Sequence, residues 1–213
     1  MPVISVDKIS KSYRGQTLFE GASAEFDSGQ ITAITGPNGS GKSVLFRMIC
    51  GFTRPDAGSI RIAPEFMSGN NRFPEQFGIL IDGPGYLPFV TGYGNLERLA
   101  RIHGIAGRSE IVAAMEAVGL DPNTKQYVRN YSLGMKQKLG IAQAIMEDQQ
   151  VLLLDEPFNG LDRDSTTRVR QLILDAKTAG KTVIFSSHIR EDVEMLADKV
   201  YEVNSQTLQL QVK

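Results

Sequence analysis

Gly36-Pro37-Asn38-Gly39-Ser40-Gly41-Lys42-Ser43 is the stretch of this sequence that decides the fold. It satisfies the pattern G-x-x-x-x-G-K-[ST], and it lies between an apolar run at 31–35 and a helix-compatible stretch at 44–49. Glycines let such a loop turn tightly and point its N–H groups inward, while the following helix adds partial positive charge at its N-terminus. The context therefore predicts a phosphate-binding loop for a nucleoside triphosphate, rather than a glycine-rich turn that binds nothing.

The residues of this loop have distinct expected roles. Lys42 would reach the terminal phosphates, and the Ser43 hydroxyl would ligate Mg²⁺. Because Lys42 would face the reacting phosphate, it is also counted among the expected catalytic residues. Further contacts to the nucleotide are expected from Gly36, Pro37, Asn38, Gly39, Ser40, Gly41 and Val44.

Composition and charge exclude several other classes of protein. The 213 residues are 41% hydrophobic and 22% charged, which is typical of a globular chain with a sizeable core. The net charge of −1 offers no basic field for nucleic acid or anionic lipid. No apolar stretch approaches the roughly 18–20 residues of a membrane span, and no signal peptide is recognisable, so a cytoplasmic protein is expected. Cys50 is the only cysteine, which excludes an intrachain disulfide and predicts a buried structural thiol.

Hydrophobic periodicity predicts an α/β protein. Strands are expected at 4–9, 22–26, 31–35, 59–62, 77–81, 151–154 and 182–185, with an edge hairpin from 199–203 and 207–212. A helix is expected at 164–176, and 95–148 is helical in character. This alternation indicates parallel strands with crossover helices, interrupted by an inserted helical subdomain. We expect one domain over 1–213, with a nucleotide-binding core from 1–81 and 149–213 and a helical subdomain from 82–148.

Two adjacent carboxylates follow the apolar strand at 151–154. In an open parallel sheet, ligands gather at the carboxyl ends of strands, so Asp155 should lie beside the phosphate loop and hold Mg²⁺ with Ser43. Glu156 would then polarise the attacking water and accept its proton. The alternative is a strand that simply ends in two exposed acids before Pro157.

The two histidines receive different interpretations. His188 ends an apolar strand that should neighbour the phosphate strand, which would place it within reach of a γ-phosphate. The alternative is a structural histidine, whose hydrogen bonds are all made within the fold and which has no role in the reaction. His103 precedes Gly104 at the end of a helical stretch, so a surface or capping role is expected for it.

With Tyr131-Ser132-Leu133-Gly134-Met135-Lys136-Gln137-Lys138, these motifs make the chain resemble an ABC-type ATPase, the nucleotide-binding subunit of ABC transporters. The octet corresponds to the family signature, usually written L-S-G-G-Q and followed by basic residues, and the similarity covers essentially the whole length. The resemblance implies a P-loop core of RecA-like type with a mostly parallel sheet, an N-terminal antiparallel β-region and an inserted helical subdomain. It also implies ATP and Mg²⁺ as ligands and ATP hydrolysis as the reaction.

The resemblance implies a head-to-tail dimer, in which each ATP lies between the phosphate loop of one subunit and the signature of the other. Ser132 and the Gly134 amide would contact the γ-phosphate, although Ser132 could instead only cap its helix. Tyr13 would stack on adenine, with a plain surface tyrosine as the alternative. The segment 159–162 matches the family's loop that communicates across the dimer.

Two departures from the family pattern stand out. Asp82 occupies the place of a glutamine that contacts magnesium and the membrane partner, and its carboxylate could still coordinate Mg²⁺ directly or through water. Leu133 and Met135 replace the usual glycine and glutamine of the signature. Together these features resemble the bacterial subfamily that exports bacitracin-like peptides, lantibiotics and other drugs.

The resulting hypothesis is an ATPase subunit that energises transport through a separate multi-span membrane permease. The helical subdomain and the segment 82–88 would form the docking groove, which would hold the protein at the cytoplasmic face of the membrane. A non-transport ABC ATPase acting on the ribosome or DNA is the alternative, and an ATP-dependent kinase or synthetase would not explain the signature. No nucleic acid is expected as a partner.

Overall fold

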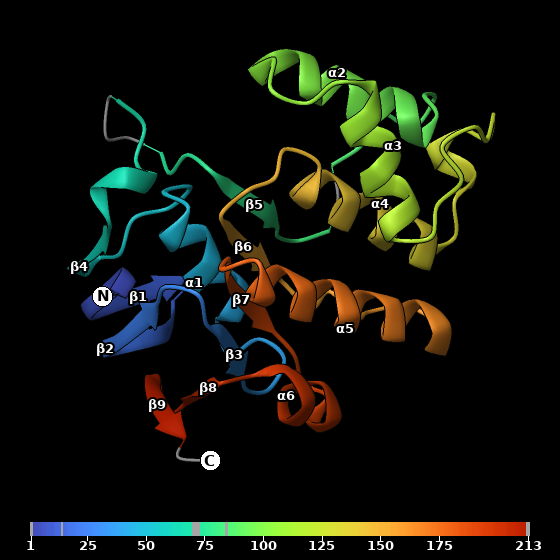
Figure 1. The fold of residues 1–213 in the computed structure, drawn as a ribbon. Coiled ribbons are helices and arrows are strands. Elements are labelled where there is room, and N and C mark those ends of the chain that lie inside the picture. The colour runs from blue at the N-terminus through green and yellow to red at the C-terminus, as the bar shows by residue number, and fades with distance from the viewer. Residues whose placement is uncertain (1, 14, 70–72, 84, 212–213) are drawn as a thin grey trace.

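The computed structural model describes residues 2–13, 15–69, 73–83 and 85–211. Its larger sheet has six strands in the order β5-β6-β7-β3-β8-β9, and all neighbours pair in parallel except the antiparallel pair β8–β9 (Figure 1). The bounds of these strands are β3 Ile31–Thr35, β5 Phe77–Leu80, β6 Val151–Leu154, β7 Thr182–Ser186, β8 Lys199–Asn204 and β9 Thr207–Gln211. The mostly parallel sheet and the edge hairpin are confirmed, and Val212 of the predicted hairpin lies outside the described residues.

A smaller antiparallel sheet has the order β2-β1-β4, with bounds β1 Pro2–Tyr13, β2 Gln16–Asp27 and β4 Ala57–Ile62. The predicted strands 4–9 and 22–26 were too short, because both strands continue through several irregularities in their pairing. Helix α1 (Lys42–Ile49) buries Leu45, Phe46 and Ile49 in a core that it shares with both sheets. The expected N-terminal antiparallel region is therefore confirmed.

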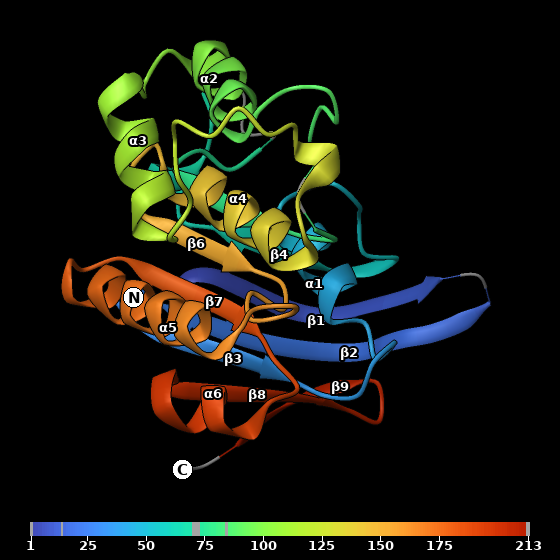
Figure 2. The same ribbon diagram turned by 90° about the vertical axis from the view of Figure 1, so that its right-hand side faces the viewer.

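Side chains of the central strands alternate between two hydrophobic cores, as the two-residue period of a strand requires. Val151 and Leu153 of β6 join the core around α1, whereas Leu152 and Leu154 join the core on the opposite face. The opposite face is covered by α4 (Leu133–Ile145), α5 (Arg163–Thr178) and α6 (Arg190–Leu196), while α3 (Arg108–Ala117) packs on α4 and α2 (Gly92–His103) packs on α3 (Figure 2). Both faces of the central strands are thus buried, which explains their continuously apolar sequences.

The helices α2, α3 and α4 lie between β5 and β6 in the chain and form the upper part of the molecule in Figure 1. Short 3₁₀ turns occupy Pro64–Phe66 and Val128–Asn130, and the second of them interrupts the stretch 95–148 that was expected to be helical. Thr91, Ser132 and Asp162 begin α2, α4 and α5 by accepting hydrogen bonds from backbone N–H groups of the first turn. The division into 1–81 with 149–213 and 82–148 stays a prediction.

The structure also tests the expectations about the cysteine and about membrane spans. Cys50 is fully buried, and burial raises the pKa of its thiol to about 12, which confirms the predicted structural thiol. Within the described ranges, none of the helices is both long and apolar enough to cross a membrane.

Candidate active site

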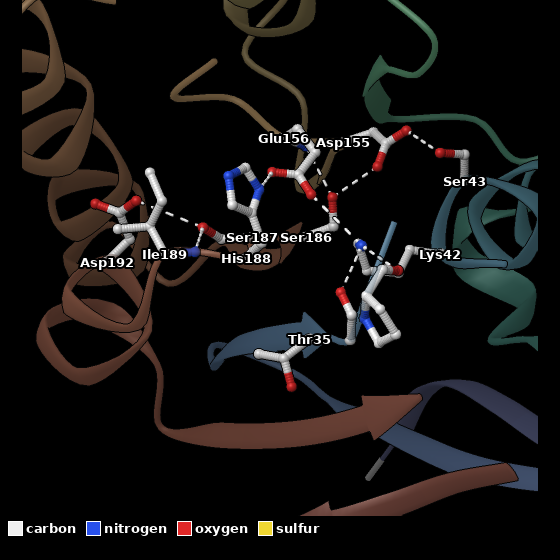
Figure 3. A network of polar contacts seen from close by, with 12 residues as sticks. Thr35, Lys42, Ser43, Asp155, Glu156, Ser186, Ser187, His188, Ile189 and Asp192 are labelled. Carbon is white, nitrogen blue, oxygen red and sulfur yellow. Dashed lines mark hydrogen bonds and ion pairs between the residues drawn. The ribbon is translucent and has the colours of Figure 1, made fainter. Parts of the chain in front are cut away.

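Three neighbouring strands bring the predicted site residues together. The sheet order β6-β7-β3 places the carboxyl ends of these strands side by side, and β7 pairs directly with β3 through Ile34 and Ser186. The phosphate loop follows β3, Asp155 and Glu156 follow β6, and His188 lies just beyond β7. Figure 3 shows the side chains from all three segments converging on one region. The expected placement at the carboxyl ends of the strands is confirmed.

The phosphate loop adopts a backbone that only glycine accommodates readily. Gly36, Gly39 and Gly41 have φ of 138°, 79° and 107°, in or near the left-handed region. A Cβ on Gly41 would lie 3.0 Å from the ring of Phe19, whereas a Cβ on Gly39 would meet nothing within 4 Å. The loop is therefore packed tightly on the protein side at Gly41 and open at Gly39, as a phosphate cradle requires.

Lys42 is folded back into its own loop. Its Nζ donates to the carbonyl oxygens of Gly36 (2.8 Å) and Pro37 (3.2 Å), and it lies 3.6 Å from Glu156 Oε1. The side chain is only 6% exposed. Because an ammonium group has three donors, Lys42 can exchange these loop contacts for phosphate oxygens without leaving the site.

A chain of short hydrogen bonds joins the loop to the two acids. Ser43 Oγ donates to Asp155 Oδ2 at 2.5 Å, and Ser186 Oγ donates to Asp155 Oδ1 at 2.6 Å. The backbone N–H of Glu156 in turn donates to Ser186 Oγ at 2.8 Å. The hydroxyl and carboxylate oxygens of Ser43 and Asp155 are the hard ligands that Mg²⁺ prefers, so this pair fits the ion.

Glu156 occupies the centre of the site. Its Oε2 lies 2.9 Å from His188 Nδ1, where the ring N–H can donate to the carboxylate, and its Oε1 is buried without a hydrogen-bond partner among the described residues. Its backbone is in the left-handed region at φ 48°, a conformation that costs of order 1 kcal/mol in a residue with a side chain. Gln137 Nε2 of α4 donates to the Glu156 carbonyl oxygen at 2.9 Å and so helps to hold this conformation.

A cavity of about 300 Å³ lies over these groups. Its lining residues are Tyr13, Gln16, Leu18, Asn38, Gly39, Gly41, Lys42, Ser43, Val44, Asp155 and Glu156. Tyr13 lines this cavity and is 49% exposed. Backbone N–H groups, an ammonium, a hydroxyl and two carboxylates in one cavity can bind a triphosphate and its metal and activate water.

The signature residues lie elsewhere. Ser132 and Gly134 are not among the described residues that line this cavity, and Ser132 Oγ accepts a hydrogen bond from Met135 N at 3.2 Å, so its capping role is confirmed. A Cβ on Gly134 would lie 2.6 Å from the carbonyl oxygen of Gly160, so only glycine allows α4 to approach the 159–162 segment this closely. Contact of the signature with a nucleotide stays a prediction.

Asp82 is engaged with another residue of the chain. Its Oδ2 accepts from Arg47 Nε at 2.7 Å and from Arg47 Nη2 at 2.5 Å, and about half of its side chain is exposed. It does not line the cavity that contains Ser43 and Asp155. Its predicted role as a metal ligand stays a prediction. His103 is exposed, as expected, and its Nδ1 lies 2.9 Å from Oε2 of Glu147, whose side chain is buried.

Sequence reasoning missed Ser186 and Gln137 as parts of the site. Ser186 is fully buried and contacts both acids, but a serine at a strand end has no distinctive pattern. The one available signal was its position two residues before His188, on a strand expected to neighbour the phosphate strand. Gln137 belongs to the signature octet, yet its contact with Glu156 joins residues 19 positions apart.

Ser186→Ala should lower the turnover number for ATP by about 10–100-fold, because a ligand-orienting hydroxyl is lost, while ATP affinity changes little. Steady-state phosphate release and titration with a fluorescent ATP analogue measure the two quantities. Ser187→Ala is the matched control. Ser187 contacts Asp192 and the Ile189 N–H, but it contacts neither of the two site acids, Asp155 and Glu156. Equal turnover in both variants would show that Ser186 does not position the site.

Comparisons with known proteins complete the description. A family model described as "ABC transporter" matches residues 19–159. The chain is 36% identical over 211 residues to the uncharacterized ABC transporter ATP-binding protein YybJ of Bacillus subtilis (strain 168), covering 99% of this chain and 97% of that protein. It is 36% identical over 200 residues to the bacitracin transport ATP-binding protein BcrA of Bacillus licheniformis, covering 93% of this chain and 65% of that protein. A solved ATP-binding subunit of an ABC transporter, 24% identical, superposes with a TM-score of 0.84 over 99% of this chain and 90% of that one. This last likeness confirms the fold class.

Proposed function

The chain belongs to the ABC transporter family of ATP-binding subunits, as its motifs predicted, and from that premise we propose that it drives export of a peptide or drug. As a member of the family it binds and hydrolyses ATP to energise transport. The observation that carries the assignment is Glu156, whose carboxylate lies between Lys42 and His188 and beside the Asp155–Ser43 pair. The likeness to a bacitracin transport protein supports a peptide or drug as substrate.

We propose the following division of roles in hydrolysis. Ser43 and Asp155 would hold Mg²⁺, which supplies positive charge against the β- and γ-phosphates when bound. Lys42 would transfer its donors from the loop carbonyls to phosphate oxygens, and Tyr13 would stack on the adenine ring. Glu156 would accept a proton from the attacking water. His188 contacts Oε2 of Glu156 and would lie next to the γ-phosphate.

A head-to-tail dimer would complete the site, with Ser132 and the Gly134 amide of a second copy facing the γ-phosphate. The exposed Leu133 in the first turn of α4 supports this arrangement, because hydroxyl and N–H donors at a helix N-terminus suit an anion. The segment 159–162, which contacts α4 through Gly160 and Gly134, would pass information between the two sites.

Docking to a separate membrane permease would hold the protein at the membrane surface. A second cavity, of about 450 Å³, supports the segment 82–88 and the helical subdomain as the docking groove, because Gly83 and Gly85 line it together with residues of β5, α2 and α4. This groove shares no lining residue with the nucleotide cavity. A partner could therefore bind without blocking ATP.

Affinity purification of the tagged chain from detergent-solubilised membranes tests the proposal. We expect a hydrophobic multi-span protein to co-purify, and the purified complex to hydrolyse ATP. Nuclease treatment and a high-salt wash before elution remove material held only by charge. Recovery of ribosomal proteins or DNA in place of a membrane protein would instead favour a non-transport ATPase.

A further inference from the structure

The docking groove contains a buried acid that the nucleotide site does not use. Glu147 follows α4, lines the 450 Å³ cavity, and has a side chain that is 6% exposed. Its Oε2 accepts hydrogen bonds from Gln149 Nε2 at 3.0 Å and from His103 Nδ1 at 2.9 Å. Its Oε1 is buried without a hydrogen-bond partner among the described residues. One oxygen of a carboxylate at the base of an open groove therefore still requires a donor.

Within the described part of the chain, a lysine balances the charge of Asp148, but no lysine or arginine balances the charge of Glu147. Asp148 is exposed and forms an ion pair with Lys181. Among the described residues, Glu147 is ion-paired only with His103, which is charged only when protonated. A buried carboxylate is costly unless it is paired, so the groove is complementary to a cation that comes from outside.

Large apolar side chains border the same groove. Phe52 is 61% exposed and Ile102 is 74% exposed, and both line the cavity together with the largely buried Phe77 and Leu80 of the edge strand β5. Exposed apolar groups around a desolvated polar group are typical of protein–protein recognition, where anchors exclude water from a buried charged contact. A hydrated metal ion or a small anion would leave these apolar groups uncovered.

We propose that the groove receives a segment of the membrane partner that carries an arginine or lysine, which Glu147 binds through its free oxygen, and apolar side chains that cover Phe52 and Ile102. The inference rests on the proposed function, because it requires a membrane partner. It adds the chemistry by which this chain selects that partner. His103 and Gln149 are positioning residues that hold the carboxylate toward the groove.

Binding of the purified chain to stripped membrane vesicles from its source organism tests this inference. Glu147→Gln should bind at least about tenfold more weakly than the unchanged chain, because a charged pair is lost. Ile102→Ser, a change at an exposed position, should also weaken binding. Asp148→Asn is the matched control, since it removes a neighbouring charge outside the cavity, and it should bind like the unchanged chain. ATP turnover of each isolated variant should stay at the level of the unchanged chain and shows that it is folded.

The possible outcomes separate the two proposals. If Glu147→Gln and Ile102→Ser both bind like the unchanged chain, the inference is overturned while the membrane partner stands. If the unchanged chain does not bind the vesicles, the proposed function fails and the inference with it. Equal binding to protein-free liposomes made from the same lipids would show a lipid surface as the occupant and would also overturn the inference. Selective loss of binding in Glu147→Gln and Ile102→Ser supports it.

Discussion

Glu156→Gln should bind ATP normally and hydrolyse it at least about 100-fold more slowly, because an amide cannot accept the proton of the attacking water. The substitution keeps the size of the side chain and an oxygen for the His188 N–H at the position of Oε2. The backbone contacts to Ser186 and Gln137 are also kept, so the left-handed conformation at this residue should persist. We expect ATP to accumulate in a closed dimer, visible by size-exclusion chromatography with ATP and Mg²⁺.

Phosphate release under single-turnover conditions measures the chemical step of this variant directly. Glu194→Gln is the matched control, because Glu194 pairs with Arg190 on the exposed side of α6 and does not line the nucleotide cavity. Near-normal turnover of Glu156→Gln would remove Glu156 from the role of general base. Failure of the variant to form an ATP-dependent dimer would argue against the head-to-tail arrangement.

Lys42→Ala should lose productive ATP binding, with affinity lowered by about 100-fold or more. Removal of a buried cation that would face phosphate oxygens costs roughly 2–5 kcal/mol, and each 1.4 kcal/mol corresponds to about tenfold in affinity. The substitution also frees the carbonyls of Gly36 and Pro37, so the empty loop loses two internal hydrogen bonds. Titration with a fluorescent ATP analogue in the presence of Mg²⁺ gives the affinity.

The comparison between the two variants is decisive for the assigned roles. Lys177→Ala on the surface of α5 controls for loss of a lysine, since Lys177 pairs with Asp198 away from the nucleotide cavity. An equal loss of ATP affinity in Lys42→Ala and Glu156→Gln would contradict the separation of binding from proton transfer. A loss confined to Lys42→Ala supports it.

The parts of the fold that depend on local sequence could be predicted. Continuously apolar runs predicted β3 and β6 at their observed bounds, because strands buried on both faces leave little ambiguity. Irregular pairing obscured the ends of β1, where the register shifts between Ile9 and Lys11. Helix α6 was not predicted, because Arg190–Leu196 is too short to show a helical period.

The site could be predicted where a motif encodes it and not where the fold assembles it. The loop and the acids carry spacing patterns, so Lys42 and Asp155 could be placed in advance. The pairing of Asp82 with Arg47 joins residues 35 positions apart, and nothing local in the sequence indicates it. The same holds for Glu147 and His103, which are 44 positions apart and meet only because α2 and the end of α4 border one cavity.

The hydrogen bond from Gln137 to the Glu156 carbonyl bears on the order in which the two sites of the proposed dimer would hydrolyse ATP. In the proposed dimer, the start of α4 would serve the ATP of one site, while Glu156 of the same chain acts on the ATP of the other. Because Gln137 and the Gly134–Gly160 contact fasten these two parts together, a shift of α4 on phosphate release at one site would displace the general base of the second. The two sites of such a dimer would therefore hydrolyse ATP one after the other. The membrane permease would receive two successive conformational changes rather than a single one.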